Sequence, residues 1–124
     1  MIDISICKEL KEACPTIALG CIQAHVIVEN SSDALLKEIS SYCKVLNEEI
    51  HIEELSHLPQ IEAGRDLYKK LGKAPSKYRL SSEVLIRRVL QGKGLYKVNN
   101  VVDINNLISL KSKFPAGSYN IKNI

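Results

Sequence analysis

Apolar side chains recur at helical spacing over the longest regular stretch of the sequence, between residues 33 and 50. The recurring positions are Leu35, Ile39, Tyr42, Cys43, Leu46 and Ile50. Most are three or four residues apart, which is the spacing of one helix face. Ser32 precedes the stretch and is a favoured N-cap residue, and Asp33 suits the positive end of the helix dipole. The pattern predicts an amphipathic helix that begins at residue 33.

Four other segments combine helical periodicity with a residue that starts or stops a helix. They are a short helix between Ser5 and Pro15, a helix from Pro59 to Gly72, a helix from Ser81 to Gly92, and a helix over residues 101–110. Serine at an N-cap, proline in a first turn and glycine just past a helix end are favoured because backbone groups there lack intrahelical partners. We therefore expect five helices.

Two segments have patterns that are typical of strands. Residues 2–5 alternate between apolar and polar, and residues 16–28 contain a β-branched run. The candidate core residues of that run are Ile17, Leu19, Ile22, Val26 and Val28. With an extended stretch over residues 95–98, these segments predict an α+β fold in which helices pack on a small sheet. The chain length predicts one domain over residues 1–124.

Composition indicates the kind of core, the cellular compartment and the absence of a metal site. There is no Trp and only one Phe, so the expected core is aliphatic. The N-terminus shows no signal peptide, and no apolar run reaches the eighteen or so residues of a membrane span. Four cysteines occur without a CxxC pair. These features predict a cytoplasmic protein with free thiols, no membrane partner, no metal site and no cofactor.

Charge is distributed unevenly along the chain, although its net charge is only +3. Residues 1–64 carry four Lys and eleven acids, a balance of −7, whereas residues 65–97 carry ten Lys and Arg and two acids, a balance of +8. Such asymmetry indicates a polyanionic partner, because spread cations neutralise phosphates without reading a base sequence. The predicted RNA-binding residues are Lys69, Lys73, Lys77, Arg79, Arg87, Arg88 and Lys93.

Two features of the basic segment, defined as residues 65–97, admit more than one interpretation. Its three tyrosines, Tyr68, Tyr78 and Tyr96, lie between the cations. Either they stack on bases, or they belong to the core while the lysines only solubilise the protein. Arg65, Glu83, Arg87 and Arg88 could also pair with one another and orient the helices. Arg87 follows Glu83 by one helical turn, which favours an internal ion pair. These residues support RNA binding and a structural role about equally.

The predicted helix over residues 101–110 has two unlike sides. Its apolar side is formed by Val101, Ile104, Leu107 and Ile108. Its polar side carries Asn105, Asn106 and Ser109, with Val102 and Leu110 beside them. Polar residues interleaved with apolar ones favour a pocket wall over an open solvent face. No catalytic triad, carboxylate pair or metal signature occurs in the sequence, so these residues alone leave it open whether the protein is an enzyme.

Several motifs resemble those in the free-standing relatives of the tRNA-editing domain of the bacterial phenylalanyl-tRNA synthetase beta subunit. The motifs are GRDLYKKLG at 64–72, KAPSKYR at 73–79, SEVLIRRVL at 82–90, VNNVVDINNLISL at 98–110 and PAGSYN at 115–120. The resemblance implies an editing-domain-like fold. It also implies a protein that binds the aminoacylated 3′ acceptor end of a tRNA and hydrolyses a wrong amino acid from it.

The resemblance also implies roles for individual residues. Asn105 and Asn106 match a pair at the editing pocket, where a side-chain amide binds the ester, the terminal ribose or a water, and they are the candidate catalytic residues. Asp103, Ser109 and Gly117 are the candidate substrate-pocket residues, and Asp103 is also expected to hold the helix start. Gly117 stands where the synthetase form has a His, so any role of that His is absent here.

The resemblance covers nearly all of this chain but only about the first half of the family's domain. We therefore expect a partial or naturally short domain, which pairs with a second copy as a homodimer or with a missing C-terminal half. Residues 16–28 are the predicted exposed strand edge, because an unpaired edge recruits another chain. Two alternatives to a deacylase stay open: a non-catalytic RNA-binding module of the same fold, and a protein-interaction domain.

Overall fold

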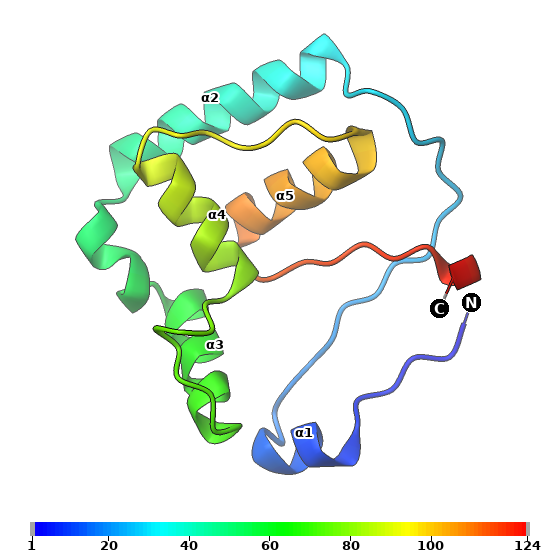
Figure 1. Ribbon diagram of the computed structural model, residues 1–124, viewed down its shortest axis with the longest axis vertical. Helices are drawn as coiled ribbons and strands as arrows, with labels where there is room; N and C mark the ends of the chain where they lie inside the picture. Colours follow the sequence, from blue (N-terminus) through cyan, green and yellow to red (C-terminus); the bar gives the residue numbers. More distant parts are fainter. Residues whose placement is uncertain (1, 124) are drawn as a thin grey trace.

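The computed structural model describes residues 2–123, which form helices joined by loops and extended segments (Figure 1). In chain order the elements are α1 (Lys8–Ala13), α2 (Asp33–Glu49), the 3-10 helix η1 (Ile52–His57), α3 (Pro59–Lys70), α4 (Ser81–Leu90), α5 (Asn100–Ser112) and the 3-10 helix η2 (Ile121–Asn123). None of these described helices is long and apolar enough to cross a membrane.

The predicted helices are present, and local signals explain most of their boundaries. The Ser32 hydroxyl accepts a hydrogen bond from a first-turn amide of α2 at 3.1 Å, and the Asn99 side chain does the same for α5 at 2.9 Å. α3 begins at Pro59, and Gly72 beyond its end has a φ of 78°, which glycine adopts without steric cost. Ser81 is the first residue of α4 instead of its cap.

The predicted α+β fold is wrong, because residues 2–123 contain no strand and no sheet. Residues 17–32 run as an extended chain (Figure 1), as β-branched residues favour. A sheet, however, needs a second strand to complete its hydrogen-bond ladder, and no described segment supplies one. Most of the predicted sheet-core side chains are therefore exposed, and Ile22 is 95% exposed. Residues 2–5 and 95–98 likewise join no sheet.

The extended segment, residues 17–32, is attached to the helices at the start of α5. The Asn100 amide and side chain bond the backbone of residues 27–29, with donor–acceptor distances of 2.8 to 3.1 Å. The Ser31 hydroxyl donates to the buried carboxylate of Asp103. The other Asp103 oxygen accepts from the backbone amide of residue 98 at 3.0 Å. Two polar residues of α5 thus fix both the end of this segment and the start of their own helix.

The hydrophobic core lies between α2, η1, α3, α4 and α5, and α4 is central because it contacts α2, η1 and α5. The buried core residues are Leu46, Ile50, Leu55, Ile61, Leu80, Ile86, Val89 and Leu110. The core is aliphatic, as the composition predicts. No residue from 2 to 32 is buried, and Figure 1 shows this part extending away from α2–α5. The core is therefore built by the helices after residue 32.

The buried side of α5 differs from its predicted apolar side. Leu107 is buried as predicted, whereas Ile104 and Ile108 are 48% and 54% exposed. Asp103 and Ser109 are buried instead, and each makes a hydrogen bond to a segment that flanks the helix. A buried polar side chain is tolerated when it has such a partner, so helical periodicity alone does not identify the inward side of α5.

Candidate nucleic-acid interface

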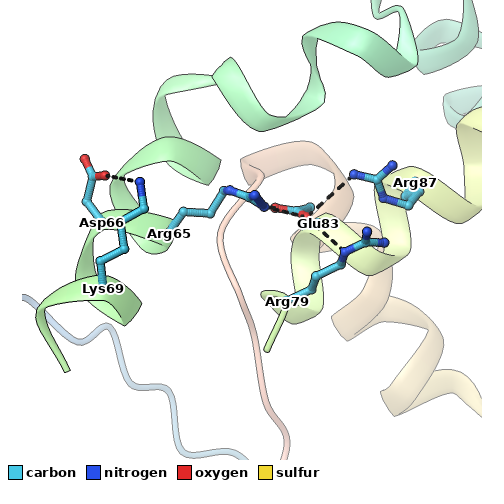
Figure 2. Close-up of polar contacts among 6 residues, drawn as sticks. All are labelled: Arg65, Asp66, Lys69, Arg79, Glu83 and Arg87. Carbon is cyan, nitrogen blue, oxygen red and sulfur yellow. Dashed lines mark hydrogen bonds and ion pairs between the residues drawn. The ribbon is translucent and has the colours of Figure 1, made fainter. Parts of the chain in front are cut away.

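The basic segment, residues 65–97, contains one buried carboxylate, and arginine side chains approach it from three sides (Figure 2). This carboxylate belongs to Glu83 in the first turn of α4. Arg65 from α3 donates Nη1 to both carboxylate oxygens, at 3.0 and 3.2 Å. Arg79 Nε lies 3.8 Å and Arg87 Nη2 lies 3.7 Å from Glu83 Oε2. The predicted Glu83–Arg87 ion pair is present, and two further arginines join it.

These four residues, which we call the arginine cluster, carry an excess of two positive charges. The Glu83 side chain is 0% exposed, whereas those of Arg65, Arg79 and Arg87 are 23%, 41% and 26% exposed. A buried carboxylate needs a cation and hydrogen bonds to offset its desolvation, and Arg65 supplies both. The other two guanidinium groups lie beyond hydrogen-bond distance of the carboxylate, so their charge exceeds what burial of the carboxylate requires.

Two of the three tyrosines in the basic segment are exposed, and each lies beside a cation. The guanidinium carbon of Arg88 is 3.9 Å from the ring centroid of Tyr96. The ammonium nitrogens of Lys73 and Lys77 are 5.0 and 5.5 Å from the ring centroid of Tyr78. Such distances are those of cation–π contacts. The third tyrosine packs against the core, so the stacking interpretation remains available for two of the three.

The remaining predicted RNA-binding residues lie at helix ends. Lys69 lies in the last turn of α3, and its ammonium is 4.0 Å from the Asp66 carboxylate (Figure 2). Lys93 is exposed in the turn that follows α4. Gly92 and Gly94 on either side of it have φ angles of 78° and 65°, and the Gly92 amide bonds a carbonyl of the last helical turn. This turn is a helix C-cap that displays a lysine.

Two of the candidate catalytic and pocket residues of α5, Asn105 and Ser109, hold the C-terminal segment against that helix. Asn105 Nδ2 donates to the Ala116 carbonyl at 3.1 Å, and Asn105 Oδ1 accepts from the Ser118 hydroxyl at 3.0 Å. The Ser109 hydroxyl donates to the Phe114 carbonyl at 2.7 Å. The Asn105 side chain thus makes hydrogen bonds through both its nitrogen and its oxygen. Together with the Ser109 bond, they hold residues 114–118 against α5.

Asn106 and Gly117 are placed differently. The Asn106 side chain is half-buried and makes no hydrogen bond to any residue from 2 to 123. Gly117 is exposed, and a Cβ added there would lie 3.1 Å from the Tyr119 ring. Asp103 faces the extended segment instead. The structure therefore brings Asn105, Ser109 and the segment around Gly117 together, but it separates Asp103 from them.

A hollow of about 170 Å³ lies between α2 and the loop after α4, and its walls are mainly apolar. Leu36, Cys43 and Tyr96 are among its lining residues, and Asp103 is the candidate pocket residue that reaches it. Burial raises the pKa of the Cys43 thiol, so the thiol stays neutral near pH 7. The sequence did not indicate this hollow, because its walls come from segments far apart in the chain.

Sequence reasoning named Arg65 and Arg87 as possible partners of Glu83, but it did not include Arg79 in that pairing. The spacing of Arg79, Glu83 and Arg87, four residues apart, is a recognisable helical signal. Arg65 has no such spacing, because its contact with Glu83 joins α3 to α4 across 18 positions, so the sequence suggested this pairing without its geometry. Among residues 2–123, no three His, Cys, Asp or Glu side chains gather as a metal site, and all four cysteines are free.

Comparison with known proteins adds one finding. The family model described as B3/4 domain matches residues 63–124, which is half of the chain and includes the whole basic segment, α4 and α5. No curated protein and no solved structure matches the chain.

Proposed function

Because the chain belongs to the B3/4 domain family of phenylalanyl-tRNA synthetase beta subunits, we propose that it binds the aminoacylated 3′ end of a tRNA. One observation carries the proposal: residues 65–97 fall inside the matched range and have a charge balance of +8. A surface with that charge binds a phosphate backbone by releasing its counterions. With a tRNA as its ligand, we expect the protein in the cytoplasm.

The arrangement of the basic segment supports an unpaired RNA end as the ligand. Single-stranded nucleic acid is bound by cations that neutralise the backbone and by aromatic rings on which bases stack. The segment offers both, since Tyr78 and Tyr96 are 44% and 64% exposed and each lies beside a cation. The unpaired nucleotides at a tRNA 3′ end present free base faces of this kind.

The first test reverses three exposed lysines of the basic segment to Glu, at Lys73, Lys77 and Lys93. Binding of a tRNA acceptor minihelix should be abolished, because three charges change sign and the net charge of the interface falls by six units. In the unmodified protein, affinity should fall linearly on a plot of log K against log salt, with a slope of about −0.7 per phosphate contacted on a single strand. Fluorescence anisotropy measures both quantities.

The matched control reverses three exposed lysines outside the basic segment, at Lys8, Lys37 and Lys44. Its net charge equals that of the first variant, so a difference between the two variants reports position and not total charge. Equal loss of affinity in both variants, or binding that does not depend on salt, contradicts the proposal.

A second candidate function, hydrolysis of the aminoacyl ester, is favoured by the state of Asn106. The Asn106 side chain is half-buried and follows Asn105 in α5, yet it makes no hydrogen bond within residues 2–123. An amide that no protein group occupies is able to bind an ester oxygen or to orient a water. This function would make the protein an editing deacylase, and its absence would leave a non-catalytic RNA-binding module.

Deacylation of a panel of mischarged tRNAs separates these two functions. If the protein hydrolyses one of them, Asn106→Ala should slow the reaction by about 10²- to 10³-fold, the usual cost of losing one oxyanion donor. Asn120→Ala, at an exposed asparagine of the C-terminal segment, is the control and should leave the rate unchanged. Retained tRNA binding without hydrolysis of any ester assigns the chain to the binding module.

A further inference from the structure

We infer that Arg79 and Arg87 form a phosphate-binding pair, and that the buried carboxylate of Glu83 holds the pair in place. The inference rests on the proposed function for the identity of the ligand, which is a phosphodiester of an RNA strand. It rests on the arginine cluster for its geometry. Glu83 is a positioning residue in this scheme, because it contacts the arginines and not the ligand.

The first step is that Glu83 does not need these two arginines for its own burial. Arg65 donates to both of its oxygens, at 3.0 and 3.2 Å, which provides a cation and hydrogen bonds. Arg79 and Arg87 approach Oε2 at 3.8 and 3.7 Å, distances that give Coulomb attraction without a hydrogen bond. Neither guanidinium makes a hydrogen bond to a residue from 2 to 123, and because Arg87 Nε is buried, the Nη groups of Arg87 are the donors that another acceptor can reach.

The second step is that two guanidinium groups beside the same oxygen repel each other. A carboxylate between them offsets that repulsion, so Glu83 keeps Arg79 and Arg87 close together in the absence of a ligand. Both side chains remain accessible, at 41% and 26% exposure. Guanidinium groups bind phosphate through two parallel N–H donors, and a pair of them fixed in advance loses little side-chain entropy on binding.

The third step distinguishes this arrangement from a purely structural ion pair. Simple electrostatics predicts that removal of a carboxylate from a basic surface strengthens RNA binding. The positioning role of Glu83 predicts the opposite, because the two arginines separate once the carboxylate charge is gone. The sign of the change in affinity thus decides between the two explanations.

The test compares Glu83→Gln with Asp66→Asn, using the full chain and a tRNA acceptor minihelix. Both substitutions replace a carboxylate of the basic segment by an amide. The Asp66 side chain, however, is 57% exposed, and Lys69 is the one cation of the basic segment that it contacts.

Glu83→Gln should weaken binding about tenfold, the effect of one lost charge-assisted hydrogen bond. Its log K against log salt slope should also fall by about 1. Asp66→Asn should bind equally well or more tightly. Equal or tighter binding by Glu83→Gln overturns the inference.

If the Glu83→Gln protein does not fold, a second variant and a second measurement still test the inference. Arg79→Gln removes a partly exposed cation and leaves the Arg65–Glu83 hydrogen bonds intact, and it should give the same tenfold loss. In the unmodified protein, the NMR signals of the Arg79 and Arg87 Nε–H groups should shift on addition of inorganic pyrophosphate and of the minihelix.

The outcomes of these experiments distinguish failure of this inference from failure of the proposed function. Shifts with pyrophosphate but no RNA binding support the phosphate pair and contradict the proposed RNA ligand. RNA binding without any shift of these two signals overturns the phosphate pair and leaves the proposed function intact. Unchanged affinity in Arg79→Gln also overturns the inference.

Discussion

At the scale of single residues, the contact between Arg88 and Tyr96 yields a prediction. The guanidinium covers the ring at 3.9 Å, while the ring remains 64% exposed, so one face is left for a base. Tyr96→Leu should weaken binding of a single-stranded RNA about tenfold, because base–aromatic stacking contributes about 1–3 kcal/mol per base. Tyr119→Leu is the control, since Tyr119 is 80% exposed and lies outside the basic segment. Equal affinities of the two variants in a binding titration would show that Tyr96 stacks on no base.

At the scale of the elements, the contact between α3 and the start of α4 depends on the lack of a side chain at Gly64. A Cβ added there would meet Leu80 Cδ1 and would lie 2.9 Å from Leu80 Cδ2, and Leu80 is a buried core residue. Helix propensity alone predicts that Gly64→Ala stabilises α3 by about 0.5–1 kcal/mol. Overpacking costs about 1–3 kcal/mol, so we expect the free energy of unfolding to fall. Urea denaturation measures it, with Gly20→Ala as a control in open space. A more stable Gly64→Ala protein would contradict this account.

At the scale of the whole molecule, the helices were predictable because their signals are local. A cap such as Ser32, a first-turn Pro59 and a terminal Gly72 act within a few residues of the boundary they set. The sheet was wrongly predicted because a strand needs hydrogen bonds to a second strand, and that strand can lie anywhere in the chain. The pairing of Arg65 with Glu83 was suggested by the sequence, but its geometry could not be predicted for the same reason. The sequence thus identified the cations of the candidate interface and Glu83 as a partner for some of them, but not that three arginines gather around that carboxylate.

The attachment of the extended segment to α5 has a mechanical consequence. Asn100 and Asp103 join residues 27–31 to the first turn of the helix that carries Asn105 and Asn106. A partner that displaced the extended segment would either break these few hydrogen bonds, at about 1 kcal/mol each, or carry the helix start with it. If the helix start moves with the segment, occupation of the segment and the position of the two asparagines are thermodynamically linked. Such linkage is reciprocal, so a ligand held at Asn106 would in turn alter the affinity of the extended segment for its partner.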